Sequence, residues 1–192
     1  MLGSGEGTTI DFFCQRIKTK ELKVRVAALI SDRKNSGVER VANRHQIPFY
    51  LVEYENSKRW EERFLRVISS FNPQFVLLAG FLRKIPASVI SQFPQSIINS
   101  HPSLLPDFSG HGMYGLRVHQ AVIQSQKKQT GVTIHLVDEN WDSGPVIKQK
   151  TLTVLPQETA LQLQERVKKI ERELYLKTFS QIITGEIKLS EI

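Results

Sequence analysis

Two polar residues, separated by one position, follow a short apolar segment near the middle of the chain. Asn99 and His101 stand in Asn99-Ser100-His101-Pro102, directly after the apolar stretch that begins at Ser96. The asparagine amide is a donor for a developing oxyanion, and an imidazole donates or carries a proton near neutral pH. Ligands bind outside the carboxyl ends of parallel strands, so both side chains are candidates for a catalytic site. The alternative is a rigid, proline-bounded turn in which the two side chains only satisfy backbone groups.

A second group of polar residues follows the apolar segment that contains His135. This acidic turn runs from Asp138 to Pro145 and includes Asp142. A carboxylate at this place can raise the pKa of a facing imidazole and accept a proton during a reaction. The spacing does not establish that contact, since an aspartate before Ser-Gly-Pro also commonly caps its own turn.

The third candidate is the glycine-rich segment Gly3–Thr9, which runs into the helical stretch Ile10–Ile17. Free N–H groups at a helix N-terminus and two threonine hydroxyls suit a phosphate group, although a tight turn without a ligand is equally common. The spacing matches neither the dinucleotide fingerprint nor a P-loop. Such a turn normally follows a strand of about five residues. Only Met1 and Leu2 precede this one, so we expect the first strand to be truncated.

The elements that must position these residues can be read from the hydrophobic pattern. Apolar segments alternate with amphipathic segments of helix length, which predicts an α/β fold: a Rossmann-like, mostly parallel, twisted sheet with helices on both faces. The near-continuous apolar character of the strands predicts burial on both faces. Leu163, Val167, Ile170 and Leu174 recur at steps of three and four, which predicts a long C-terminal helix that ends near Gly185. The predicted strands are Val24–Ser31, Phe49–Val52, Phe75–Leu78, Ser96–Asn99, Val132–Val137 and Val146–Val154, and the other predicted helices are Gly37–His45, Ser57–Ser70 and Gly115–Ser125.

Composition limits the class of protein. The 192 residues contain no repeat, linker or low-complexity stretch, so we expect a single domain over residues 1–192. The net charge of +7 favours anionic partners. Basic residues occur mainly as short pairs such as Lys127-Lys128, without interleaved aromatic residues, so a nucleic-acid surface is not expected.

Several other classes lack support in the sequence. The lone Cys14 excludes an internal disulfide framework and fits a reducing cytosol, so we expect a cytoplasmic protein. No stretch of about 18 apolar residues and no targeting signal is present, so membrane insertion and export are not expected. The histidines form no short metal motif, and the Gly-x-Ser-x-Gly motif of serine hydrolases is absent.

Three motifs occur in order along the chain. They are Leu78-Ala79-Gly80-Phe81-Leu82-Arg83, Asn99-x-His101-Pro102-Ser103-Leu104-Leu105-Pro106 and Asp142-x-Gly144-Pro145-Val146-Ile147. Together they resemble the phosphoribosylglycinamide formyltransferases, and the resemblance covers nearly the whole chain. It implies a single formyltransferase domain that transfers the formyl group of 10-formyltetrahydrofolate to the amine of N1-(5-phosphoribosyl)glycinamide in purine biosynthesis. It also implies small-molecule substrates, a folate co-substrate and no metal, with a monomer and a homodimer both open.

The resemblance also implies roles for individual residues at matching positions. Asn99, His101 and Asp142 would form the catalytic trio. The ribotide would contact Gly7, Thr8, Thr9, Lys168, Lys169 and Glu171. The folate would contact Lys58, Leu82, Arg83, Lys84, Ile85, Asn99, Asp138, Glu139, Asn140 and Trp141.

The chain departs from the family pattern at one position of the glycine-rich turn. Thr9 stands where family members usually have asparagine, so the phosphate contact would use a hydroxyl. Two alternatives stay open. One is formyl transfer to another amine, on a sugar nucleotide or an aminoacyl-tRNA, although tRNA-directed relatives carry a further C-terminal domain that we do not expect in a chain of this length. The other is a non-catalytic protein that binds folate or ribotide.

Overall fold

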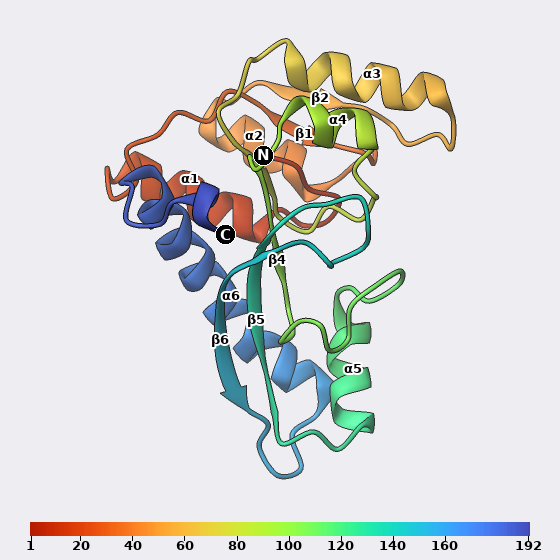
Figure 1. Ribbon diagram of the computed structural model, residues 1–192, viewed down its shortest axis with the longest axis vertical. Coiled ribbons are helices and arrows are strands. Elements are labelled where there is room, and N and C mark those ends of the chain that lie inside the picture. Colours follow the sequence, from red (N-terminus) through yellow and green to blue (C-terminus); the bar gives the residue numbers. More distant parts are fainter. The chain divides into compact units, whose positions relative to one another are not determined.

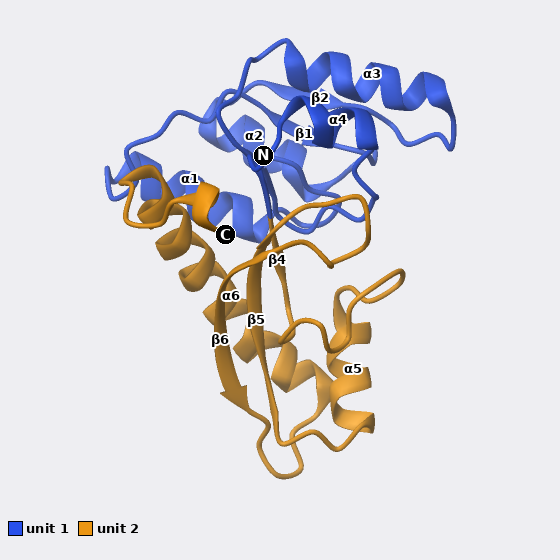
Figure 2. Ribbon diagram, in the orientation of Figure 1, with its two compact units in different colours: residues 1–98 blue, residues 99–192 orange.

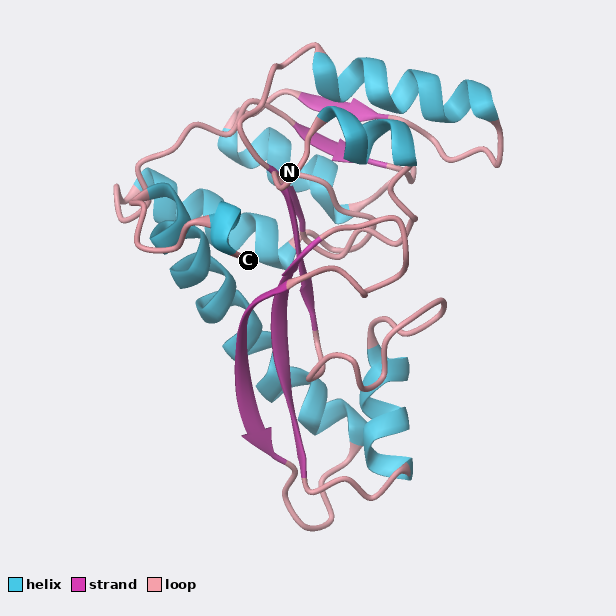
Figure 3. Cartoon of the chain, viewed as in Figure 1, coloured by secondary structure: helices cyan, strands magenta, loops and turns pink.

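The computed structural model describes all 192 residues, and these form two compact units (Figure 2). Unit 1 comprises Met1–Ile98 and unit 2 comprises Asn99–Ile192. Helices and strands alternate along the chain (Figures 1 and 3). Unit 1 contains α1 (Thr8–Lys18), β1 (Leu29–Ser31), α2 (Gly37–His45), β2 (Phe49–Leu51), α3 (Lys58–Ser69), β3 (Val76–Leu78) and α4 (Ala87–Gln92). The strand β4 (Ile97–His101) begins in unit 1 and ends in unit 2, which continues with α5 (Leu116–Gln124), β5 (Gln129–Leu136), β6 (Val146–Thr153), α6 (Ala160–Ile183) and the short 3-10 helix η1 (Leu189–Glu191).

The sheet of unit 1 is parallel. β1 pairs with β2, so that Leu29 lies opposite Phe49. Leu2 forms parallel bridges to both Ile30 and Leu78, which places the N-terminal segment between β1 and β3. This single-residue bridge lies where the sequence led us to expect a truncated first strand, and it delivers the glycine-rich segment to the carboxyl edge of the sheet.

Apolar residues of α1, α2 and β1 form a core beside this sheet. Ile10 and Cys14 of α1 pack with Leu29, Val38 and Val41, all of them buried. The spacing of the buried residues on α1 and α2 gives each helix one apolar face. Both helices are thereby fixed against the strand that they flank.

Unit 2 combines the end of β4 with two long strands and two helices. β5 and β6 are antiparallel, and the strand order is β3-β4-β5-β6. The helix α6 packs against β5, β6 and α5. A capping box at Thr159 and Gln162 starts α6, and its buried face includes Leu163, Val167 and Leu174.

The predicted α/β class with a sheet rich in parallel strands is confirmed, as is the long C-terminal helix. The predicted strand Val24–Ser31 was too long, since β1 has only the three residues of β2 to pair with. Burial on both faces was wrong for β6, an antiparallel edge strand with mostly exposed or half-exposed residues. The helix α4 was missed because six residues are too few to display a helical period. No helix has the length and apolar character needed to cross a membrane.

Candidate active site

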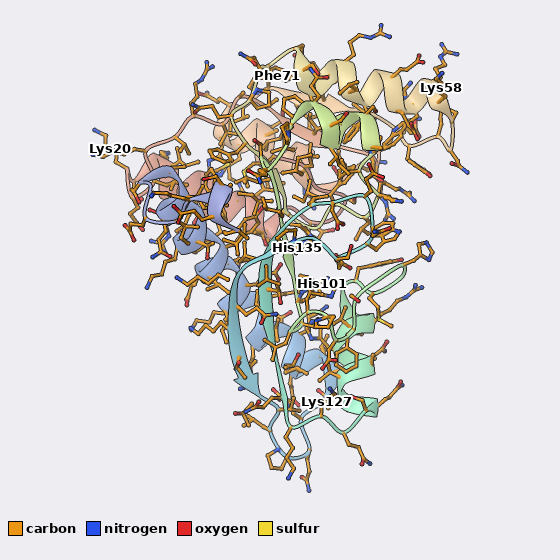
Figure 4. The ribbon with its side chains drawn as sticks, in the orientation of Figure 1. Lys20, Lys58, Phe71, His101, Lys127 and His135 are labelled. Atoms are coloured by element: carbon orange, nitrogen blue, oxygen red, sulfur yellow. The ribbon has the colours of Figure 1, made fainter.

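The three predicted catalytic side chains come together in unit 2. Asn99 and His101 lie on β4, and because they are two residues apart they share one face of the strand. Asp142 follows β5 in the turn predicted from the sequence. His135, on β5, lies beside them, and Figure 4 labels this histidine and His101.

Local backbone geometry holds Asp142 in place. Its φ of 53° lies in the left-handed region, which asparagine and aspartate tolerate better than most residues. A Cβ at Gly144 would lie 2.0 Å from the Leu136 carbonyl oxygen, so only glycine lets the turn pack this closely on the end of β5. The Asp138 carboxylate accepts hydrogen bonds from the Asn140 N–H and the Ser143 hydroxyl, which closes the turn.

His101 has an oxygen acceptor at each ring nitrogen. Its Nε2 lies 2.8 Å from the Phe108 carbonyl oxygen, and because a carbonyl only accepts, Nε2 carries a hydrogen. Its Nδ1 lies 3.5 Å from Asp142 Oδ2. A second proton on the ring would therefore lie between the imidazole and the carboxylate. The ring is buried, so few water molecules compete for it.

The Asp142 carboxylate is a base held in its ionised form. Burial by itself would raise its pKa, but the hydrogen bond and charge of His101 and the hydrogen bond from the Gly110 N–H outweigh it, and the pKa lies below its ordinary value. The Gly110 N–H donates to Asp142 Oδ2 over 3.2 Å, so the loop before α5 contacts the turn after β5. The arrangement provides a proton acceptor beside two hydrogen-bond donors.

His135 is a residue that our reading of the sequence did not include in the site. Its Nε2 lies 3.1 Å from Asn99 Nδ2 and 3.8 Å from Asp142 Oδ1. The sequence feature that could have pointed to His135 is its place inside a strand predicted to be buried, because a buried polar ring needs a hydrogen-bond partner. No group of three or more His, Cys, Asp or Glu side chains is placed to hold a metal ion.

The predicted ribotide residues on α6 have different surroundings. Glu171 is half-buried, and its Oε1 accepts a 2.6 Å hydrogen bond from the Ser100 hydroxyl. Lys168 is half-exposed and pairs with Glu165, one turn earlier on the helix. Lys169 is exposed. Among these three residues, Glu171 contacts β4, the strand that carries Asn99 and His101.

The predicted phosphate turn lies in unit 1, directly before α1. Gly7 adopts a φ of 72° and directly precedes α1, so Thr8 and Thr9 form the first helical positions, where N–H groups lack helical partners. The Ser4 hydroxyl accepts from the Leu82 N–H over 2.9 Å. The glycine-rich turn and the predicted folate residue Leu82 are therefore neighbours within unit 1.

The predicted folate residues of unit 1 are partly engaged with other side chains. Arg83 Nε donates to Asp32 Oδ2 over 2.8 Å, and its guanidinium lies 4.1 Å from the centre of the Tyr54 ring. Ile85 is buried, while Lys58 and Lys84 are exposed. In unit 2 the predicted folate segment is the turn just described, where Trp141 makes an edge contact with the His111 ring and Glu139 and Asn140 are exposed.

This fold and this cluster of asparagine, histidine and aspartate define a class. The model of the formyl transferase family matches residues 1–179, and the chain belongs to this family. The chain is similar to proteins named phosphoribosylglycinamide formyltransferase. It is 37% identical over 187 residues to the chloroplastic protein of Vigna unguiculata, covering 96% of this chain, and 29% identical to the Bacillus subtilis protein, covering 95% of this chain and 93% of that one.

Solved structures agree with this assignment. The crystal structure of phosphoribosylglycinamide formyltransferase from Bacillus halodurans has a TM-score of 0.86 and 31% identity, covering 95% of this chain and 93% of that chain. Glycinamide ribonucleotide transformylase 1 from Geobacillus kaustophilus has a TM-score of 0.85 and 33% identity, covering 94% and 95%. The chain spans about 60% of the length of the plant relatives it matches.

Proposed function

We propose that this protein transfers the formyl group of 10-formyltetrahydrofolate to the amine of N1-(5-phosphoribosyl)glycinamide, a step of purine biosynthesis. The observation that carries the proposal is the approach of His101 and Asp142 to 3.5 Å, with Asn99 on the same face of β4. Family membership and the names of the relatives support the same reaction.

The neutral amine of the ribotide attacks the formyl carbon, and the carbonyl oxygen becomes an oxyanion in a tetrahedral intermediate. Asn99 stabilises this oxygen as a hydrogen-bond donor, and protonated His101 stabilises it by its positive charge, because both of its ring nitrogens already face oxygen acceptors. Asp142 is ionised at neutral pH, and its carboxylate lies 3.5 Å from His101 Nδ1.

Two proton movements complete the transfer. Asp142, directly or through a water molecule, accepts the proton that the attacking nitrogen loses. Asp142 then passes this proton, directly or through the same water molecule, to the folate nitrogen as its bond to the formyl carbon breaks, and the oxyanion reforms a carbonyl. The products are the formylated ribotide and tetrahydrofolate, with no net change in protons on the protein. Because the protein holds the two substrates side by side, the activation barrier falls by several kcal/mol, on the order of the entropic cost of a bimolecular encounter.

The substrate contacts are part of the proposal. The turn Gly7–Thr9 would bind the ribotide phosphate through N–H groups and hydroxyls, which its position at the start of α1 supports. Lys168, Lys169 and Glu171 would contact the rest of the ribotide. For the folate, the contacts would come from Lys58, Leu82, Arg83, Lys84, Ile85, Asn99, Asp138, Glu139, Asn140 and Trp141.

We also propose that both units together make one formyltransferase domain, because the family model extends over both. The partners would be small molecules rather than nucleic acid or membrane, and the protein would act in the cytoplasm as a monomer or a homodimer. The single cysteine supports a reducing compartment.

The test is formyl transfer to the ribotide, followed by folate absorbance, in wild type, His101→Ala and Asp142→Asn. We expect turnover that falls at least about a hundredfold in both variants, as for the loss of a general acid or base. His45→Gln is the matched control, since that histidine pairs with Asp11 in unit 1, away from the trio in sequence. Folate binding without turnover in wild type would favour a non-catalytic protein, and turnover with a different amine would overturn the substrate.

A further inference from the structure

The protonation state of His135 can be deduced from its neighbours. The ring lies on β5 and is 2% exposed. Its Nδ1 lies 2.8 Å from the Leu136 carbonyl oxygen. Because a carbonyl oxygen only accepts, Nδ1 carries the hydrogen of the neutral ring, and Nε2 is left as an unprotonated acceptor.

The surroundings favour this neutral ring. Burial lowers the pKa of His135 below its ordinary value, and the charge of His101 acts in the same direction. The Leu136 carbonyl and the carboxylates of Asp142 and Asp138 oppose that shift only in part. At neutral pH, Nε2 therefore has a lone pair directed at its neighbour.

That neighbour is the Asn99 side chain. Its Nδ2 lies 3.1 Å from His135 Nε2, and only the NH₂ end of a carboxamide can donate to a lone pair. The opposite orientation would place the Oδ1 lone pairs of Asn99 against Nε2. One N–H of Asn99 is thus engaged, and the second N–H and the carbonyl oxygen have their directions fixed.

The local strand geometry supports a dedicated role for this histidine. The β5–β6 register shifts between Ile134 and His135, and such irregularities redirect side chains near active sites. The Nε2 of His135 faces two members of the trio, since it also lies 3.8 Å from Asp142 Oδ1. Packing alone would not require an unprotonated ring nitrogen that faces Asn99.

We propose that His135 is a positioning residue that sets the orientation of the Asn99 carboxamide, so that one N–H of Asn99 is directed at the formyl oxygen. This inference deepens the proposed function and rests on it for its consequence in catalysis. The histidine itself does not contact the reacting atoms. It acts by selecting one of the two amide orientations before the substrates bind.

The first test is independent of turnover. Nitrogen-15 NMR of the imidazole rings distinguishes a protonated Nδ1 from a protonated Nε2. We expect His135 to have a protonated Nδ1 and a bare Nε2 at neutral pH, and an Nε2 that becomes protonated in Asn99→Asp, where a carboxylate replaces the donor. A protonated Nε2 in wild type, or a His135 spectrum unchanged in Asn99→Asp, would overturn the proposal.

The second test compares two replacements of His135. Glutamine can accept from Asn99 through Oε1, whereas phenylalanine fills the space without an acceptor. We expect His135→Phe to lose roughly a hundredfold in kcat with little change in either KM, and His135→Gln to recover at least about tenfold of that loss, as misplacement of one catalytic group predicts. His119→Gln, at a second buried histidine of unit 2, should leave kcat unchanged.

Two outcomes would contradict a positioning role. The first is an equal kcat in wild type and His135→Phe. The second is an equal loss of kcat in His135→Phe and His135→Gln that parallels the fall in their melting temperatures. Absence of turnover in wild type would instead count against the proposed function. The NMR measurement would then still decide how the Asn99 amide is oriented.

Discussion

The Ser100 hydroxyl lies 2.6 Å from Oε1 of Glu171, so a β4 residue located between two members of the trio donates to a carboxylate on α6. Oxygen-to-carboxylate bonds of this length are among the stronger hydrogen bonds in proteins. Burial raises the pKa of Glu171, opposed by the Ser100 hydrogen bond and by the charges of His101, Arg172 and Lys168. Ser100 therefore helps to keep Glu171 ionised and in one position.

Replacement of Ser100 by alanine should weaken ribotide binding specifically. Loss of a hydrogen bond to a charged group predicts a rise of roughly tenfold in the KM for the ribotide, with the KM for folate unchanged. Steady-state kinetics with each substrate varied in turn measures this, and Ser100→Thr, which retains the hydroxyl, is the matched control. A lower melting temperature with an unchanged ribotide KM would show that the pair only joins β4 to α6.

Gly5, within the glycine-rich turn, should tolerate a side chain, whereas Gly37, the first residue of α2, packs against that turn and should not. A Cβ at Gly37 would lie 2.1 Å from the Glu6 carbonyl oxygen, whereas a Cβ at Gly5 meets nothing within 4 Å. Gly37→Ala is expected to destabilise the protein by roughly 2–4 kcal/mol because backbone must move. Gly5→Ala should change stability by less than about 1 kcal/mol. Urea unfolding of the two variants checks the difference, and equal stabilities would contradict the packing described for this turn.

Arg83 should prove important for stability. The Asp32 side chain is fully buried, and its Oδ2 accepts from Arg83 while its Oδ1 has no hydrogen-bond partner. Arg83→Ala removes the nearer cation and leaves only Arg33, whose Nε lies 3.9 Å from Oδ2, so we expect a loss of up to about 3 kcal/mol. The double variant Asp32→Asn, Arg83→Ala should recover part of that loss in thermal unfolding. A raised folate KM without any loss of stability would indicate instead that the Arg83 side chain serves the folate.

Stability should decrease below pH 6.5 because of His119. Burial lowers its pKa to about 4, with further contributions from the charges of Lys168 and His101. In the unfolded chain His119 binds a proton near pH 6.5, whereas in the folded protein it binds one only near pH 4. The free energy of unfolding therefore falls as the pH drops through this window. The effect amounts to roughly 3 kcal/mol by pH 4.

His119→Gln removes this titration, so its free energy of unfolding should vary less between pH 6.5 and 4 than that of wild type. In wild type the Nδ1 of His119 is buried without a hydrogen-bond partner, so the substitution removes no hydrogen bond at that atom. Denaturant titrations at several pH values provide the comparison. Parallel pH profiles for the two proteins would assign the acid instability to other groups.

The sequence predicted the elements with long or regular patterns. The helix Gly37–His45 was predicted with its observed bounds, and α6 followed from a period repeated over 20 residues. The extent of β1 was not predictable, since strand length depends on a partner distant in sequence. The antiparallel direction of β6 depends on the turn at Asp138–Pro145, whose geometry includes a left-handed aspartate.

The site was predictable to a similar degree. Their place after a buried strand made Asn99 and His101 candidates, and an acidic turn made Asp142 one, but their joint assignment as a trio came from the resemblance to formyltransferases. The contact between His135 and Asn99 joins β5 to β4 across 36 positions, and periodicity carries no information about such a pair. The Ser100–Glu171 bond spans 71 positions and was unpredictable for the same reason.

The strand β4 uses both of its faces. Asn99 and His101 point to one side and Ser100, between them, to the other. A shift of β4 by one residue would exchange these sides. The hydrogen bond from Ser100 to Glu171 and the contact between His101 and Asp142 would then be lost together. An insertion or deletion of one residue within β4 should therefore be far more damaging than most substitutions there, and natural variation in length should be confined to the loops at its ends.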